Sequence, residues 1–196
     1  MPDIYLIRHG MTEGNKKQRY IGTTDETLCP EGKAALTGID CPEPESLFVS
    51  PLLRCRETAE ILFPGKMQEI CPGLSECDFG DFENKNYLEL SHNPDYQAWV
   101  DSNGTLPFPN GESRESFRWR TLEEFNRIVE ECFKKEINTA ALVIHGGTIM
   151  NIMEAYGSPA RDFYDWHVKN GRGYLVQADC DLWETKQRFL ELIKEI

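Results

Sequence analysis

The sequence has no long hydrophobic run and no excess of basic residues. No apolar stretch approaches the roughly 20 residues that a transmembrane helix requires. Residues 1–10 also lack the basic region and longer apolar run of a signal peptide. The formal net charge is -12, whereas nucleic acids and anionic membranes attract basic surfaces. We therefore expect no nucleic acid and no membrane as a partner, and an anionic substrate would require positive charge gathered in one small pocket.

Disulfide and metal-binding motifs are also missing. The seven cysteines are odd in number and never form Cys-x-x-Cys, so neither a secreted disulfide framework nor a zinc ribbon is indicated. The four histidines form no closely spaced pair of the kind found in histidine-rich metal sites. We expect a cytoplasmic protein with reduced thiols and no bound metal. Nothing in the sequence indicates the oligomeric state.

Three familiar motifs of phosphate chemistry are absent as well. No Cys-x5-Arg occurs, which excludes a cysteine-based phosphatase. Asp179-x-Asp181 lacks the Thr or Val that usually follows an aspartyl nucleophile motif two residues later. Gly32-Lys33 and Gly65-Lys66 lack the earlier glycine of a P-loop. Any phosphate chemistry in this chain therefore needs another nucleophile.

The pattern that is present alternates strands with helices. Short apolar runs predict strands at 4–7, 47–49, 140–144 and 173–178, and amphipathic segments predict helices at 31–36, 52–63, 114–135 and 149–156. This alternation is typical of an α/β fold, here a three-layer α/β/α sandwich with a mainly parallel sheet. A length of 196 residues fits one domain, 1–196.

The segment 71–112 breaks this alternation. It is rich in Pro, Gly, Asn, Asp and aromatic residues, and we expect at most two short helices in it, near Tyr87 and Tyr96. We interpret it as a small inserted cap over the active site. The tail, 183–196, fits either a helix or a hairpin strand.

Two histidines occupy similar positions in this pattern. His9 and His145 each follow a predicted strand and each precede a glycine, and ligands of parallel sheets bind beyond the carboxyl ends of the strands. Arg8 precedes the first histidine, and Arg54 lies near the start of the helix that follows the second strand. Arginine suits phosphate oxygens, and a neutral imidazole can attack phosphorus. The sequence therefore predicts a cationic pocket for a phosphate ester, with His9 as nucleophile.

Hydrolysis also needs an acid that protonates the departing alcohol. Glu76 is the best candidate, because it lies in the insertion among apolar neighbours, where burial would keep a carboxyl protonated. Asp78 and Glu83 are the alternatives.

Four ordered segments, 6–15, 50–59, 74–83 and 143–147, together resemble the histidine phosphatase superfamily in its phosphoglycerate-mutase-like branch. The resemblance implies a phosphoglycerate mutase-like fold, a phosphohistidine intermediate and no cofactor. Cys29 departs from the family pattern, which usually has Ser or Thr there. The residues to which the resemblance gives a catalytic or phosphate-binding role are His9, Glu76, His145, Arg8, Arg54, Asn15, Gly22 and Gly146.

We therefore expect a phosphatase that hydrolyses small phosphate monoesters, with alpha-ribazole 5'-phosphate or a sugar phosphate as candidate substrates. A phosphoglycerate mutase and a catalytically inactive scaffold that binds phosphorylated ligands are the alternatives. Ring-bearing residues could stack on a substrate or form the core of the cap: Tyr87, His92, Tyr96, Trp99, Phe108 and Trp119.

Overall fold

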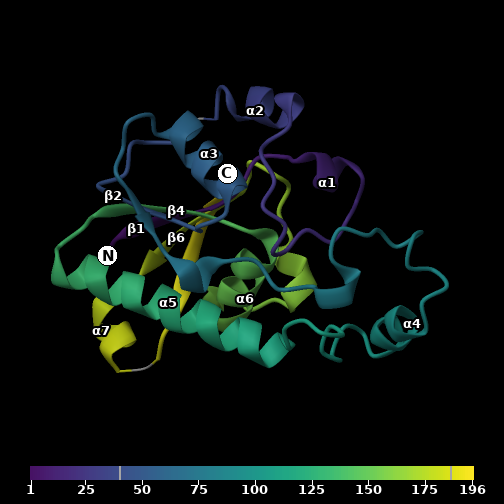
Figure 1. Ribbon diagram of the computed structural model, residues 1–196. Coiled ribbons are helices and arrows are strands. Elements are labelled where there is room, and N and C mark those ends of the chain that lie inside the picture. Colours follow the sequence, from purple (N-terminus) through teal and green to yellow (C-terminus); the bar gives the residue numbers. More distant parts are fainter. Residues whose placement is uncertain (40, 186) are drawn as a thin grey trace.

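A seven-stranded sheet with the order β3-β2-β4-β1-β6-β7-β5 forms the centre of the molecule (Figure 1). The computed structural model describes residues 1–39, 41–185 and 187–196. Among the described strands β6 alone runs antiparallel to its neighbours, so the sheet is mainly parallel, as predicted. The strands are β1 (Asp3–Arg8), β2 (Ser46–Val49), β3 (Gln68–Ile70), β4 (Thr139–Ile144), β5 (Gly157–Ser158), β6 (Gly173–Ala178) and β7 (Leu190–Glu195).

The two central strands position the predicted site. β1 and β4 are buried along nearly their whole length, which is typical of parallel strands covered on both faces. Their register pairs Ile4 with Ala140 and Arg8 with Ile144. Both strands therefore end at the same level, and the residues that follow them meet at the carboxyl edge of the sheet.

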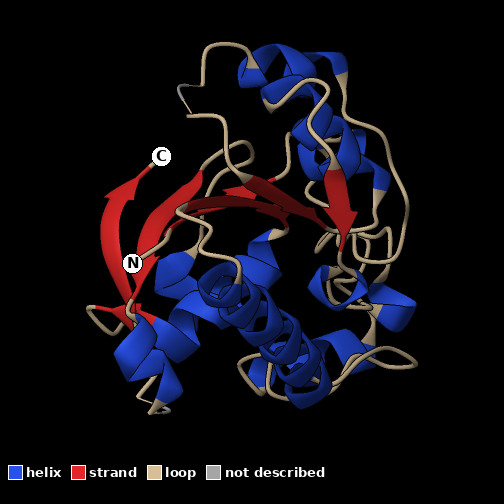
Figure 2. Ribbon diagram, turned by 90° about the vertical axis from the view of Figure 1, so that its left-hand side faces the viewer, coloured by secondary structure: helices blue, strands red, loops and turns tan. Residues whose placement is uncertain are grey.

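Helices cover both faces of the sheet, which confirms the three-layer prediction (Figure 2). On one face, Ile4 and Leu6 pack in a cluster with side chains of α5 (Arg114–Lys134), α6 (Gly146–Tyr156) and α7 (Cys180–Glu184). Tyr5 and Ile7 alternate to the other face and pack with α3 (Leu53–Leu62). The helix α2 (Pro30–Leu36) lies beside α3 on this second face. Within the described part of the chain, no helix combines the length and the apolarity needed to cross a membrane.

Side-chain caps fix where several helices begin. Ser113 accepts a hydrogen bond from Ser116 N–H at the start of α5. Thr12 forms a capping box with Asn15 at α1 (Glu13–Lys16). Cys29 caps α2, because its Sγ accepts from Gly32 N–H at 3.3 Å. The thiol thus takes the capping position where the family usually has a hydroxyl.

In the cap, residues 71–112, one of the two expected short helices is absent. The expected helix near Tyr96 is confirmed as α4 (Pro94–Asp101), but the one near Tyr87 is wrong. There, the Asn86 side chain accepts from the N–H groups of Leu88 and Glu89, and the chain forms successive turns. The 3₁₀ helices η1 (Pro72–Leu74) and η2 (Gly80–Phe82) complete the cap. In Figure 1, α4 lies at the end of the molecule farthest from the sheet.

Of the two structures expected for the tail, the hairpin strand is the one that forms. β7 pairs antiparallel with β6, and Leu190 is fully buried in the core. The short α7 precedes this strand and is capped by Asp179. Within the tail, Lys186 lies outside the described residues. The predicted helix 149–156 begins earlier, at Gly146, because the two glycines after His145 already form its first turn.

Candidate active site

The ends of β1 and β4 bring the two predicted histidines together. The ring centroids of His9 and His145 lie 5.2 Å apart, edge to face, and both side chains are buried. His9 N–H donates to the Ile144 carbonyl at 2.9 Å, so the loop after β1 is tied to the end of β4. The strand-end prediction therefore holds for both histidines.

His9 has the protonation state of a nucleophile. Its Nδ1 lies 2.7 Å from the Gly10 carbonyl, and because a carbonyl can only accept, Nδ1 carries the proton. Burial, followed by the charges of Arg54 and Arg8, holds the pKa of His9 well below its ordinary value. The ring is therefore neutral near pH 7, and Nε2 keeps a free lone pair.

Arg8 lies at the end of β1, beside His9. Its Nη1 donates to the Val168 carbonyl at 2.7 Å and contacts His167 Nε2 at 3.3 Å. Its Nε is buried and has no hydrogen-bond partner among the described residues. Burial lowers the pKa of Arg8, and the charge of Glu76 opposes that shift.

Arg54 is completely buried in the first turn of α3. Its Nη1 donates to the Thr24 carbonyl at 2.8 Å, and its Nη2 donates to the carbonyls of Ile21 and Gly22. Its Nε, like that of Arg8, is buried and lacks a partner in the described part of the chain. Across residues 1–39, 41–185 and 187–196, neither arginine forms an ion pair with a carboxylate within 4.0 Å.

These two cations create a strong requirement for an anion. A guanidinium that is held away from water without an anionic partner is costly, and a phosphate oxygen would satisfy the free Nε donors of Arg8 and Arg54. The protein as a whole is acidic, with a net charge of -12. Two of its cations nevertheless share this pocket without a carboxylate partner among the described residues, which is the local arrangement that an anionic substrate would require.

Glu76 lies on the loop after η1, facing the first turn of α6. Oε1 accepts from Cys77 N–H at 3.0 Å, and Oε2 accepts from Gly147 N–H at 3.2 Å. Burial raises the pKa of this carboxyl above its ordinary value. A Cβ at Gly147 would lie 2.5 Å from Oε1, so this glycine lets the carboxyl approach the helix.

The two alternative acids have other contacts. Asp78 Oδ1 accepts from Gly80 N–H within its own turn. Glu83 Oε1 accepts from the N–H groups of Gly22 and Thr24, and so holds the loop that Arg54 binds from the other side. The geometry favours Glu76 as the acid.

Of three further residues assigned by resemblance, two already have hydrogen-bond partners and one lies beside Arg8. The Gly22 N–H points to Glu83 at 2.7 Å. Asn15 Oδ1 accepts from Asn170 Nδ2 at 3.1 Å, which places Asn15 beside the loop of His9 but already engaged. Gly146 opens α6 next to the Arg8 guanidinium, at a helix N-terminus that favours anions.

Sequence reasoning missed several supporting residues. Ser50 Oγ lies 2.7 Å from His145 Nε2, and Thr58 Oγ1 accepts from Gly10 N–H at 2.9 Å. Asn170 Nδ2 donates to the His9 carbonyl at 3.1 Å. Ser50 directly follows β2, so the strand-end rule that identified His9 and His145 applies to it too.

A cavity of about 250 Å³ adjoins the pocket. Arg8, Glu76 and Gly146 line its polar side. Of the predicted stacking residues, Trp99 and Phe108 line it, whereas Tyr87 and Trp119 are 52% and 68% exposed. The rings around the cavity come from Tyr20, Phe79, Trp99, Phe108, Phe117, Phe163 and Tyr164.

One group of potential metal ligands occurs among the described residues, formed by Glu13, Cys29 and Glu31. Lys16 Nζ already binds both carboxylates, at 3.3 and 2.8 Å. None of the residues assigned to the active site belongs to this group.

Comparisons with known proteins agree with the geometry. The family model of the histidine phosphatase superfamily, branch 1, matches residues 4–189. An adenosylcobalamin/alpha-ribazole phosphatase of Salmonella typhimurium is 29% identical over 178 residues, which cover 86% of each chain. A 2,3-bisphosphoglycerate-dependent phosphoglycerate mutase of Cytophaga hutchinsonii is 29% identical over 164 residues, covering 78% of this chain and 76% of the mutase. The crystal structure of an alpha-ribazole phosphatase from Shigella flexneri superposes with a TM-score of 0.80 at 25% identity, covering 97% and 94% of the two chains.

Proposed function

The chain belongs to branch 1 of the histidine phosphatase superfamily, and we propose that it hydrolyses small phosphate monoesters through a phosphohistidine on His9. One observation carries the proposal: a neutral histidine with an unprotonated Nε2 lies in a pocket with two arginines, the buried Arg54 and the half-buried Arg8, that have no carboxylate partner among the described residues. Such a pocket suits a phosphoryl group, and the carboxyl of Glu76 lies at its edge.

In the first step, His9 Nε2 attacks phosphorus in line with the departing oxygen. The N–P bond forms as the P–O bond to the alcohol breaks, and Glu76 transfers its proton to the leaving oxygen. Arg8, Arg54 and His145 bind the non-bridging oxygens and stabilise the charge of the transition state.

In the second step, the Glu76 carboxylate takes a proton from water. The water oxygen attacks phosphorus, the N–P bond to His9 breaks, and inorganic phosphate leaves. The nucleophile and the acid are then restored, so the chain's own residues account for every proton and electron pair.

Replacing Glu76 by glutamine is expected to slow hydrolysis of alkyl phosphates by about 10²–10⁴-fold. Aryl phosphates with acidic leaving groups should lose less in the first step, because their oxygen needs little protonation. Rates of alcohol release in single turnovers, for a series of esters with different leaving-group pKa values, measure this first step apart from the attack of water. Asp78→Asn, on the same loop, is the matched control and should behave as the parent; an equal loss for all esters would argue against Glu76 as the acid.

The pH dependence of kcat/KM follows from the shifted pKa values of His9 and Glu76. The pKa of His9 is depressed, so the nucleophile stays neutral well into the acid range. Activity is lost only when the pH falls below this depressed pKa. The pKa of Glu76 is raised, so the acid stays protonated above the range of an ordinary carboxyl and activity on alkyl phosphates falls at higher pH. Initial rates across pH test this, and Glu76→Gln should remove the alkaline decline. A decline that persists in that variant would assign it to another group.

The alternative of a phosphoglycerate mutase is kept open by the Cytophaga hutchinsonii relative. It shares the first step and differs in the acceptor, which is a second alcohol instead of water. A phosphoglycerate also carries a carboxylate, but the adjoining cavity is mainly aromatic, and its Arg114 already pairs with Glu154 at 3.0 Å. This lining favours hydrolysis of esters with less polar alcohols. Phosphate release without a bisphosphoglycerate primer distinguishes the two.

The lining also suggests the kind of alcohol. Trp99 and Phe108 present rings to the cavity, and the Trp99 indole N–H is buried without a partner among the described residues. A planar heteroaromatic alcohol such as alpha-ribazole would stack on these rings and could accept the indole hydrogen bond. A sugar phosphate would make less use of both.

Trp99→Ala is therefore expected to raise KM for alpha-ribazole 5'-phosphate roughly tenfold. The KM for glycerol phosphate should change little, because a small alcohol does not reach the ring. The exposed Trp119 provides the matched control as Trp119→Ala. The same rise in KM for both esters would contradict a stacking role.

A further inference from the structure

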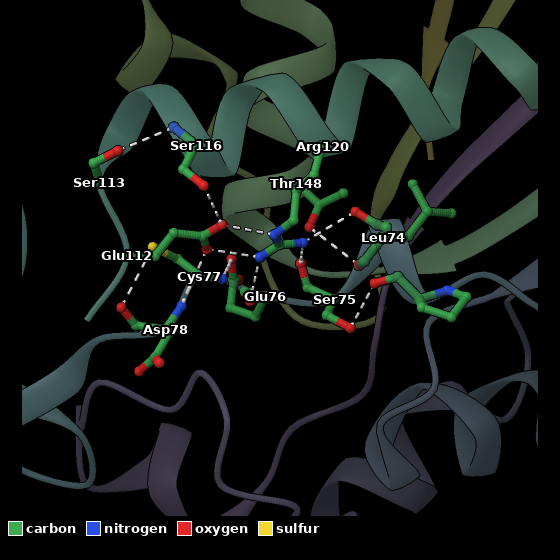
Figure 3. Close-up of polar contacts among 12 residues, drawn as sticks. Leu74, Ser75, Glu76, Cys77, Asp78, Glu112, Ser113, Ser116, Arg120 and Thr148 are labelled. Atoms are coloured by element: carbon green, nitrogen blue, oxygen red, sulfur yellow. Dashed lines mark hydrogen bonds and ion pairs between the residues drawn. The ribbon is translucent and has the colours of Figure 1, made fainter. Parts of the chain in front are cut away.

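Arg120 on α5 uses all of its hydrogen-bond donors next to the Glu76 loop (Figure 3). Its Nε and Nη2 each donate to one carboxylate oxygen of Glu112 at 2.8 Å. Its Nη1 donates to the carbonyls of Gly73 and Ser75 at 3.0 and 2.8 Å, and Nη2 donates to the Glu76 carbonyl at 2.8 Å. An arginine has five N–H donors, so each one has a partner here.

The acceptors show what the guanidinium holds. Three of them are backbone carbonyls within four consecutive residues, 73–76, which form the turn that carries the Glu76 side chain. A Cβ at Gly73 would lie 2.6 Å from Glu124 Cβ on α5, so this turn lies directly against the helix. Arg120 thus fixes the loop to α5 through main-chain contacts that depend on no other side chain of the loop.

Glu112 extends the same restraint to the other side of Glu76. Its N–H donates to the Asp78 carbonyl at 2.9 Å, and its Oε2 accepts from Asp78 N–H at 3.4 Å. The ion pair with Arg120 therefore joins two segments that flank Glu76, as Figure 3 shows. The side chains of Arg120 and Glu112 are only 24% and 13% exposed, so solvent screens this ion pair less than a pair on the surface.

The restraint reaches the acid's own contacts. Arg120 lies over the Phe117 ring, 4.9 Å from its centroid, and Phe117 lines the cavity beside Gly147. Gly147 N–H is the donor to Glu76 Oε2. The backbone of the acid is thus held by α5, while its carboxyl is held by the first turn of α6.

We propose that Arg120 and Glu112 are positioning residues that place the Glu76 carboxyl for proton transfer to the leaving alcohol and from water. The proposal rests on the proposed hydrolysis, since Glu76 has an acid role only there. Among the described residues, neither side chain forms a hydrogen bond with His9, Arg8, Arg54 or His145, and the charge of Arg120 that acts on His145 is kept in a lysine variant, so the effect of losing the fork passes through Glu76. Proton transfer is sensitive to small displacements of the acid.

Arg120→Lys tests the proposal, because lysine keeps the charge but offers one nitrogen in place of the planar fork. We expect the rate of alcohol release from a bound alkyl phosphate, measured in single turnovers, to fall about 10–100-fold with little change in KM. An aryl phosphate with a good leaving group should be affected much less. In the Glu76→Gln background the same substitution should cost nothing further, because the positioned group is already removed.

Arg127→Lys is the matched control. Arg127 lies on the same helix and pairs with Glu69, Glu124 and Glu131 in a more exposed network. In the described part of the chain it forms no hydrogen bond with residues 73–76. Its kcat should equal that of the parent. If Arg120→Lys does not fold, Glu112→Gln removes the ion-pair charge while keeping an acceptor oxygen, and a smaller loss with the same leaving-group dependence is expected.

Three results would overturn the proposal: an equal loss in the rate of alcohol release for alkyl and aryl esters, a loss that adds to that of Glu76→Gln, or a lower melting temperature with unchanged rates. Each would show a structural brace instead of a positioning role. Failure of the proposed function is seen separately, because then the single Glu76→Gln variant would already lack any dependence on the leaving group.

Discussion

Replacing His9 by alanine is expected to lower the release of phosphate from any monoester by about 10⁵-fold or more, because the covalent path is lost with the nucleophile. The arginines remain, so the variant should still bind inorganic phosphate or a substrate ester. Steady-state phosphate release from an aryl phosphate measures the loss, and a calorimetric titration with phosphate measures the retained binding.

The matched control for this variant is His92→Ala, which removes an exposed histidine of the cap and should leave turnover unchanged. Substantial activity in His9→Ala would exclude His9 as the nucleophile. The same assay on the parent chain separates the enzyme from an inactive scaffold, which would bind phosphate and release none.

Replacing Arg54 by alanine is expected to reduce kcat/KM by about 10³-fold. This residue is completely buried, and its partner-free Nε is one of the two donors that a phosphate would satisfy. Arg54→Lys keeps the charge without the planar fork, so it should recover only part of the loss. Initial rates over a range of substrate concentrations give the value for each variant.

Two checks accompany the Arg54 variants. Arg54 also donates to the carbonyls of the loop 21–24, so thermal unfolding must show that the variants remain folded. Arg56→Ala removes an exposed arginine on the same helix and should retain full activity. A folded Arg54→Ala protein with nearly normal kcat/KM would show that Arg54 does not bind the transferred group.

The elements of the fold and the centre of the site could be predicted for a common reason. Strands β1 and β4 are continuous apolar runs, and the position after such a strand is where parallel sheets place functional groups. His9 and His145 could therefore be found without knowing which strands are neighbours.

The features that could not be predicted depend on contacts distant in the sequence. β3 and β5 have only three and two residues, too few for a periodic pattern. Arg120 holds the Glu76 loop through backbone carbonyls, which carry no side-chain signature. The helix expected near Tyr87 does not form, although Asn86 caps a first turn as Asn93 does for α4. The hydrogen bonds that follow span three residues, from Ser91 N–H to Leu88 and from Asn93 N–H to Leu90, so the chain continues as turns.

Detection of a phosphoryl group on His9 tests the central claim most directly. The Glu76→Gln variant, in which water attack should be slow, is mixed with an aryl phosphate and quenched with base, since phosphohistidine is labile in acid. Mass spectrometry of the intact protein and of its peptides then locates the added group. We expect one phosphoryl group per chain, on His9, and none in the His9→Ala protein; a phosphoryl group on any other residue, or rapid release of phosphate with no phosphorylated protein at any time, would contradict a phosphohistidine mechanism.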